Sequence, residues 1–144
     1  MLLRRGQQAI QALLELAQDP PRWRSVNELA EAQNLPAPML EQLLLQLRRR
    51  KLLEARRGRS GGYRLALPPR SVNLSDVLAA VEALPLASPP EGGEPASRSV
   101  TELVQTRLQR ALQRELARMT LEELLFDLHS ARAAQRIDAG LIVS

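Results

Sequence analysis

The sequence predicts a mainly α-helical chain that carries one small β-hairpin. Hydrophobic residues make up 44% of its 144 residues but aromatic residues only 2%, so Leu, Val, Ile and Ala must build the core. That composition favours packed helices over a large sheet. Apolar residues recur at helical spacing along most of the chain, and one glycine-rich turn joins two alternating stretches near its middle. A chain of this length suits one compact domain plus an accessory element.

The first two helices are predicted from apolar spacing and from capping residues. Apolar residues at positions 10, 13, 14 and 17 predict a helix over about residues 4–18, which Asp19-Pro20-Pro21 ends. Ser25 begins the second helix, because its hydroxyl can accept the backbone N–H of Glu28 in a capping box. Asn34 suits the left-handed residue that ends this helix.

A third helix over about residues 36–50 has two different faces. Its prolines, Pro36 and Pro38, are tolerated because they lie in the first turn. The inward face carries four leucines, namely Leu40, Leu43, Leu44 and Leu47. The outward face is mostly polar and suits contacts with DNA bases and phosphates through Met39, Gln42, Gln46, Arg49 and Arg50. Any solvated helix has a polar face, so this pattern alone is weak, and Leu45 fits neither face.

Two alternating stretches follow, and they predict a β-hairpin. Residues 52–57 and 63–67 flank the turn Gly58-Arg59-Ser60-Gly61-Gly62, and Arg57 and Arg59 project from its tip. A phosphate-binding loop is excluded, because no Gly-Lys-Ser/Thr follows and no strand–loop–helix order surrounds the glycines. Three helices followed by such a hairpin form a winged helix-turn-helix, in which an arginine of the wing can enter a minor groove or contact a phosphate.

The rest of the chain is predicted to be helical around one proline-rich segment. Asn73 caps a fourth helix with Asp76, and residues 85–97 hold four prolines and two glycines, which is typical of a linker. A long helix follows, capped by Ser99 with Glu102 and ending near residue 118. The final helix is capped by Thr120 with Glu123.

The long helix carries an apolar stripe with little of its own chain to cover it. We predict that a second copy covers this stripe through Val104, Leu108, Ala111, Leu112 and Met119. Packing against the chain's own first helix is the alternative, and the sequence leaves it open. The predicted divisions are a winged helix-turn-helix domain, a flexible linker loop, dimerisation helices and a C-terminal tail, over residues 1–84, 85–97, 98–132 and 133–144.

Charge is distributed unevenly along the chain. The formal net charge is +4, but residues 1–70 hold 13 Arg/Lys against 6 Asp/Glu, whereas residues 71–144 hold 7 against 10. Eight basic residues and one acidic residue fall within residues 48–64 alone. A basic run by itself is usually a solvated surface, but here it coincides with the helix-turn-helix and the wing. We therefore expect double-stranded DNA as a partner.

Several other classes of function are not expected. The chain has no cysteine, which excludes disulfides, thiolate catalysis and cysteine-ligated metals within it. Its single histidine, His129, lies near the end of a helix, and no carboxylate pair or nucleophile–base arrangement stands out, so we expect neither an enzyme nor a metal site. No apolar run approaches the ~20 residues of a membrane span, and the N-terminal stretch lacks a signal-peptide core. A cytoplasmic protein without membrane contact is expected.

Specific residues in these elements match a known family. They are Leu29-Ala30, Leu35-Pro36, Leu40-Glu41-Gln42-Leu43 and, above all, Arg57-Gly58-Arg59-Ser60-Gly61-Gly62-Tyr63. With Leu74–Glu82 and Thr120–Leu124 they resemble the Rrf-two family of bacterial winged-helix regulators, which includes the iron–sulfur cluster regulator and the nitric-oxide-sensing repressor. The resemblance spans most of the chain, and the wing motif is its most specific part.

This resemblance implies roles for individual residues. Glu41 and Gln42 fall where the family contacts bases, Arg57 falls on the arginine that enters the minor groove, and the long C-terminal helices pair two subunits. The chain departs from the family in two places. Pro36 and Pro38 stand where hydroxyl residues are frequent, and residues 85–97 lack the three cysteines that hold the cluster in sensing members. We therefore expect no iron–sulfur cluster and no other cofactor.

The expected function is that of a sequence-specific transcription regulator that binds a palindromic operator as a homodimer. Its signal would be a small-molecule or protein effector that the sequence does not identify. Two alternatives stay open, namely a winged-helix protein-interaction module and a non-specific nucleic-acid-binding protein. Salt dependence separates them, because phosphate contacts lose affinity with salt whatever the base sequence, whereas base contacts add discrimination.

Overall fold

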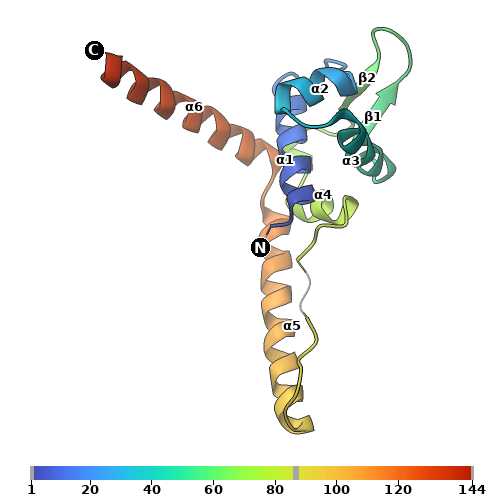
Figure 1. Ribbon diagram of the computed structural model, residues 1–144, viewed down its shortest axis with the longest axis vertical. Coiled ribbons are helices and arrows are strands. Elements are labelled where there is room, and N and C mark those ends of the chain that lie inside the picture. The colour runs from blue at the N-terminus through green and yellow to red at the C-terminus, as the bar shows by residue number, and fades with distance from the viewer. Residues whose placement is uncertain (1, 86–87, 144) are drawn as a thin grey trace.

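The computed structural model describes residues 2–85 and 88–143. These residues form a compact winged body from which two long helices project (Figure 1). The body holds α1 (Arg4–Ala17), α2 (Val26–Gln33), α3 (Ala37–Arg49), a hairpin of β1 (Leu53–Arg56) and β2 (Gly62–Leu65), and α4 (Leu74–Ala80). A short 3-10 helix, η1 (Pro69–Ser71), joins the hairpin to α4. The predicted mainly α-helical winged fold is confirmed.

Local capping fixes where the helices of the body begin and end. The Ser25 hydroxyl accepts the backbone N–H of Glu28 at 3.1 Å, and Asn34 adopts φ 54 and ψ 49 at the end of α2, as predicted. Asn73 caps α4 in the same way, accepting the Asp76 N–H at 3.0 Å. These caps satisfy backbone groups that a helix leaves unpaired at its ends.

A single residue, Arg24, pairs with the hairpin as a third strand would and holds it to the body. Leu53 pairs with Leu65 and Arg56 with Gly62 in an antiparallel register. On the other side of β2, the backbones of Arg24 and Tyr63 exchange two hydrogen bonds of 2.9 and 2.7 Å. A two-stranded hairpin alone is marginal in water, so this extra pairing fixes the wing to the segment between α1 and α2.

Leucines from α1, α2, α3 and α4 form one continuous core with the two strands. The fully buried members include Leu13, Leu16, Leu29, Leu40, Leu43, Leu44, Leu47 and Leu78. Leu121, the first residue of the last helix, is also fully buried, and its N–H donates to the Val72 carbonyl at 2.8 Å. The junction of the two C-terminal helices is therefore anchored on the body.

The two C-terminal helices differ from their predicted bounds. α5 spans Pro95–Arg118, so the prediction that Ser99 caps it is wrong. Pro95 occupies the first helical turn, where its missing N–H costs nothing, and the Ser99 hydroxyl instead donates to the Pro95 carbonyl at 3.1 Å. α6 spans Leu121–Val143, and Thr120 caps it as predicted, with its hydroxyl oxygen accepting the Glu123 N–H at 3.2 Å.

Two further expectations for this part of the chain need correction. Residues 133–143 are helical, so the predicted tail is wrong, because the sequence there has no proline and no glycine before Gly140 to end α6. The expected linker over 85–97 loses its last three residues to α5, and its positions 86–87 lie outside the described residues. The described part runs beside α5, where the Gln109 side chain donates to the Pro85 carbonyl at 2.6 Å (Figure 1).

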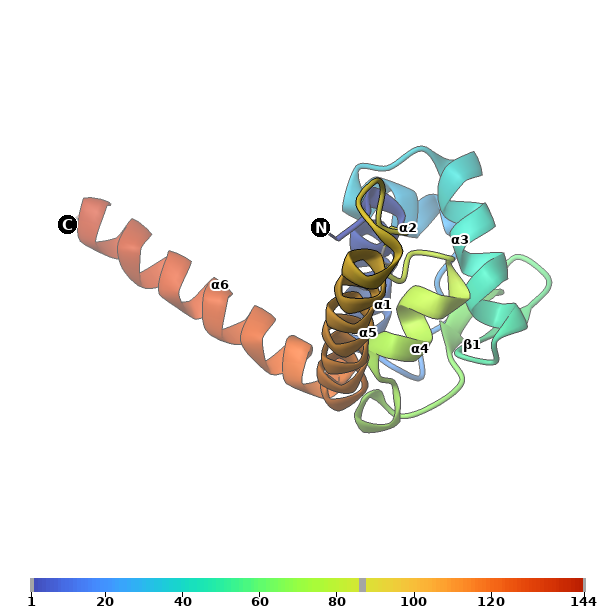
Figure 2. The same ribbon diagram turned by 90° about the horizontal axis from the view of Figure 1, so that it is seen from below.

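α5 and α6 give the molecule its open shape. α6 leads away from the body on the side opposite the hairpin in both views (Figure 1, Figure 2). Within residues 2–85 and 88–143, no helix is long and apolar enough to cross a bilayer.

Candidate nucleic-acid interface

The outward face of α3 is formed by charged and amide side chains around one leucine. Glu41, Gln42 and Arg49 are exposed, as predicted for residues that contact a partner. Leu45 follows Gln42 by three residues and precedes Arg49 by four, so it lies on this same face and is half-buried. Leu45 therefore belongs to the outward face. The sequence analysis placed it on neither face, although its spacing from Gln42 and Arg49 is that of residues on one side of a helix.

Other predicted residues of α3 lie at its sides. Met39 is half-buried, and Gln46 is half-buried with its Oε1 accepting the Arg5 Nη2 at 2.6 Å. The Arg5 Nε also donates to the Val81 carbonyl at 3.1 Å, so Arg5 and Gln46 join α3 to α1 and to the end of α4. Arg50 is exposed and lines a polar hollow with Gln46, Arg49, Ala79, Ala80 and Glu82. The side-chain oxygen of Gln46 is thus already hydrogen-bonded within the protein.

The wing tip presents two arginines to solvent. Arg57 and Arg59 are exposed, and neither has a hydrogen bond or ion pair among residues 2–85 and 88–143. Arg56 is held differently, because its Nη2 donates to the Ser60 carbonyl at 2.6 Å and closes the loop. The tip therefore offers guanidinium groups whose hydrogen-bond donors are open to a phosphate or a groove.

Trp23 contacts two arginines of the wing. The guanidinium carbons of Arg56 and Arg64 lie 4.6 and 4.1 Å from the centre of its ring, which is cation–π geometry. Arg64 also bonds the Glu54 carboxylate at 2.5 Å and the Pro21 carbonyl at 3.2 Å. Two of the eight basic residues in the predicted basic run are therefore occupied in holding the wing, a role that the sequence reasoning missed.

Two wing glycines are required by close backbone contacts. A Cβ at Gly62, where φ is +136, would lie 2.2 Å from the Arg24 carbonyl oxygen. A Cβ at Gly61 would lie 2.1 Å from the Arg56 carbonyl oxygen. These glycines thus allow close approach within the protein itself.

Tyr63 lies in β2, at the base of the wing. It is only 8% exposed, and its burial raises its pKa above the ordinary value of 10.0. The Glu41 carboxylate raises this pKa further, whereas Arg48 lowers it, so the phenol lies within electrostatic reach of these two α3 residues. The hairpin itself is joined to α3 where the chain leaves the helix, since the Leu52 N–H donates to the Leu47 carbonyl at 3.0 Å and both leucines are buried.

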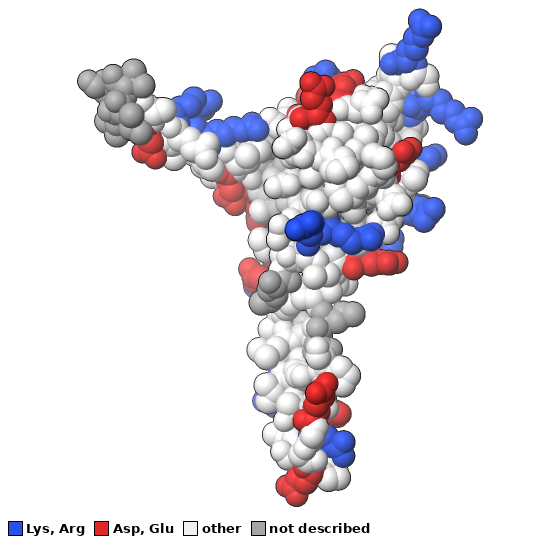
Figure 3. All heavy atoms as spheres, in the orientation of Figure 1, with Lys and Arg blue, Asp and Glu red and all other residues white. Residues whose placement is uncertain are grey.

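Basic side chains gather over the wing and the neighbouring end of α3 (Figure 3). Arg48, Arg49, Arg50 and Lys51 at the end of α3 are all exposed, as are the two arginines of the tip. The electrostatic surface of this side of the molecule suits a polyanion.

The predicted dimerisation residues divide into two groups. Val104 and Leu108 are 50% and 66% exposed, and Ala111 is also exposed. Leu112 and Met119 instead pack partly against the chain's own core. Val100 and Leu103 extend the exposed stripe along α5, and Phe126 and Ile137 of α6 are exposed as well.

Comparison with known proteins assigns the family. The family model Rrf2, described as an iron-dependent transcriptional regulator, matches residues 2–127. The chain belongs to the Rrf2 family of transcriptional regulators. An HTH-type transcriptional regulator of Synechocystis sp. is 39% identical over 139 residues, which cover 94% of each chain. The IscR regulator of Cereibacter sphaeroides is 38% identical over 102 residues, which cover 66% of each.

Solved structures give the same result for this Rrf2-family chain. The structure of T. potens IscR matches with a TM-score of 0.67 and 30% identity, covering 91% of this chain and 90% of that one. CymR, the global cysteine regulator of B. subtilis, matches with a TM-score of 0.69 and 29% identity over 87% and 95% of the two chains.

The iron named in the family description does not fit the residues of this chain. Iron–sulfur clusters are held by cysteine thiolates, and the sequence contains no cysteine and only one histidine. Within the part of the chain that the structure describes, no three His, Cys, Asp or Glu side chains gather as a metal site would require. The chain therefore cannot supply the thiolates of such a cluster.

Proposed function

We propose that this Rrf2-family protein is a sequence-specific DNA-binding transcription regulator that acts as a homodimer on a palindromic operator. The observation that carries the proposal is the pairing of two exposed polar surfaces, the outward face of α3 and the Arg57–Arg59 tip. The hydrogen bond from the Leu52 N–H to the Leu47 carbonyl and the shared leucine core join α3 to the hairpin that carries this tip. A helix and a hairpin fixed in this way can enter a major groove and the adjoining minor groove together.

In the proposed complex α3 lies in the major groove. Glu41 and Gln42 are exposed near its N-terminal end, where recognition helices contact base edges. Leu45 adds an apolar surface beside them that suits a thymine methyl group. Arg49 at the end of the helix and Arg59 on the tip suit phosphates, and Arg57 suits the minor groove.

A second copy of the chain would complete the assembly. The exposed stripe on α5, with Val104 and Leu108 at its centre, is apolar surface that a monomer leaves in water. A two-fold dimer covers the same stripe of both subunits, and it presents two winged bodies to two half-sites.

The proposal includes neither catalysis nor an iron–sulfur cluster, and it places the protein in the cytoplasm. Without cysteine ligands the signal must reach the protein in another way, through a small molecule or a protein effector. The hollow between residues 88–90 and α5 is lined by Glu102, Gln105, Thr106, Gln109 and Arg110, but no feature in it selects a ligand class.

Selection of bound fragments from bacterial genomic DNA, repeated at two salt concentrations, tests the proposal. We expect a recurring palindromic motif that is enriched at both concentrations. Enrichment without a motif, lost at the higher salt, would instead indicate non-specific nucleic-acid binding. Failure to retain DNA at either concentration would leave the protein-interaction module as the better account.

A further inference from the structure

Arg24 occupies the point where α1, α2 and the wing meet. Its backbone N–H donates to the Tyr63 carbonyl at 2.9 Å, and its carbonyl accepts the Tyr63 N–H at 2.7 Å. The next residue, Ser25, caps α2. A displacement of Arg24 would therefore move the wing and the start of the helix-turn-helix together.

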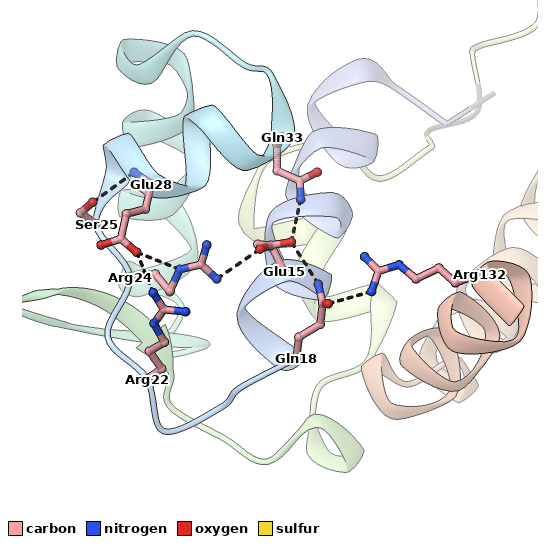
Figure 4. A network of polar contacts seen from close by, with 8 residues as sticks. All are labelled: Glu15, Gln18, Arg22, Arg24, Ser25, Glu28, Gln33 and Arg132. Carbon is pink, nitrogen blue, oxygen red and sulfur yellow. Dashed lines mark hydrogen bonds and ion pairs between the residues drawn. The ribbon is translucent and has the colours of Figure 1, made fainter. Parts of the chain in front are cut away.

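The side chain of Arg24 is clamped by two carboxylates. Its Nη1 lies 3.2 Å from Glu15 Oε1, and its Nε lies 3.1 Å from Glu28 Oε2 (Figure 4). The Arg24 side chain is only 12% exposed and that of Glu15 only 19%, so water screens this pair less than a surface pair. The two-sided contact uses the fork geometry of a guanidinium, which a lysine cannot reproduce.

Glu15 is the hub of a larger network. Its Oε2 accepts the Gln18 Nε2 at 3.0 Å and the Gln33 Nε2 at 3.3 Å, so both carboxylate oxygens are bonded (Figure 4). Arg132 of α6 donates to the Gln18 Oε1 at 2.8 Å, which brings the last helix to the edge of the same network. Glu15 thus ties α1 to α2, and through Arg24 to the wing.

We propose that Glu15 and Arg24 are positioning residues that set the place of the wing relative to α3. The proposal rests on the proposed DNA-binding function. The wing is a small hairpin whose second strand, β2, lies between β1 and Arg24, so the position of its tip depends on the position of Arg24. Glu15 and Arg24 do not reach the outward face of α3 or the tip, so they act through the two arginines that the tip presents, Arg57 and Arg59.

The test compares Glu15→Gln with the parent on a duplex chosen by the genomic selection. Removing a carboxylate makes the protein more basic, so simple electrostatics predicts tighter DNA binding. We expect the opposite, a loss of about 3- to 10-fold in affinity, because the tip arginines are no longer held in place. Glu31→Gln is the matched control, since Glu31 is exposed and has no ion pair or side-chain hydrogen bond within the described residues.

Two further readouts separate positioning from simple loss of stability. In an Arg57→Ala/Arg59→Ala background Glu15→Gln should cost nothing more, because the contacts through which it acts are already gone. The dependence of affinity on salt should weaken by about one phosphate contact in Glu15→Gln, as in Arg59→Ala. A variant that is only partly unfolded would lower the fraction of protein that can bind DNA. It would produce neither the coupling to the tip arginines nor the weaker dependence of affinity on salt.

Arg24→Lys gives a second variant if Glu15→Gln does not fold. It keeps the charge and the backbone pairing to Tyr63 but cannot hold Glu15 and Glu28 together, so the same loss and the same coupling to the tip arginines are expected. Parent-like affinity in either folded variant, or an equal loss with and without the two tip arginines, would overturn the proposal. A parent protein that selects no DNA would instead remove the proposed function on which it rests.

Discussion

The arginines of the wing differ in what holds each side chain. The side chains of Arg56 and Arg64 stack on the ring of Trp23 and form hydrogen bonds within the protein. Those of Arg57 and Arg59 face solvent without such bonds in the described residues. A count of basic residues predicts the field around this region, because charge acts at a distance. Which arginines can bond a phosphate depends on contacts made by residues distant in sequence, such as Trp23.

Tyr63 provides a direct probe of the charges around the base of the wing, because it is the only tyrosine in the chain. We expect its phenol to titrate above 10.0, and Glu41→Gln to lower its pKa by removing a nearby negative charge. The absorbance of the phenolate during an alkaline titration measures both. A Tyr63 pKa that does not respond to Glu41→Gln would contradict the electrostatic interaction between these two residues.

The same shift has a consequence for stability. The folded state favours the protonated phenol, so its contribution to the free energy of unfolding is fully present below the ordinary value of 10.0. That contribution is lost as the pH rises through the higher folded pKa. Tyr63→Phe should therefore show a smaller fall in unfolding free energy than the parent as the pH is raised above 10.0.

Gly62 tests how tightly the wing is fixed to Arg24. Gly62→Ala places a Cβ 2.2 Å from a backbone oxygen at φ +136, and we expect a loss of about 3 kcal/mol or more in unfolding free energy. Gly58→Ala is the control, because its φ is +106 but nothing lies within 4 Å of the added Cβ, so a loss of about 1 kcal/mol is expected. Urea unfolding measures both, and equal losses would be incompatible with the close contact.

At the scale of elements, three helices end on left-handed residues that are not glycine. Asn34, Lys51 and Glu82 have φ values of 54, 62 and 55. In each case the next N–H returns to a carbonyl five residues earlier, as when the Ala83 N–H donates to Leu78 at 2.7 Å. This pattern closes the helix and turns the chain, and glycine is the residue that adopts it without strain.

Glu82→Gly should therefore stabilise the protein. The left-handed conformation costs a non-glycine residue about 1 kcal/mol, and glycine removes that cost while leaving the hydrogen bonds of the turn in place. Glu82→Ala removes the same charge and should bring no gain. Chemical unfolding of the two variants measures the difference, and a Glu82→Gly protein no more stable than Glu82→Ala would refute the strain.

Elements defined by neighbours in sequence could be predicted, and those defined by distant contacts could not. Ser25, Asn34, Asn73 and Thr120 end or begin helices through bonds to residues three or four positions away, which a pattern reveals. The pairing of Arg24 with Tyr63 joins residues 39 positions apart, and no sequence pattern around either residue predicts it. For the candidate site, the exposed residues of α3 and the tip were predicted, but the engagement of Gln46 by Arg5 was not.

At the scale of the whole molecule, the body and the projecting helices present two different surfaces. The body presents the exposed basic side chains of α3 and the wing (Figure 3), and α5 presents apolar side chains to water. Leu121, buried in the body, anchors the junction between α5 and α6. A dimer formed through α5 would therefore fix the spacing of two DNA-binding surfaces.

Leu108→Glu tests this assembly. Leu108 is 66% exposed at the centre of the stripe, and a carboxylate there would be costly to bury between two copies. We expect the parent to sediment as a dimer and Leu108→Glu as a monomer. Gln113→Glu, which adds the same charge at an exposed polar position of α5, should remain dimeric. A dimeric Leu108→Glu protein would place the interface elsewhere.

The affinity of the parent and of Arg57→Ala for the selected operator tests the central claim most directly. Anisotropy of a labelled duplex, with Arg98→Ala as a charge-matched control at the far end of α5, gives the comparison. The account predicts that Arg57→Ala loses about 1–3 kcal/mol on the operator and much less on a scrambled duplex, while Arg98→Ala binds like the parent. Equal operator affinity for Arg57→Ala and the parent would contradict the claim that the wing of this protein reads DNA.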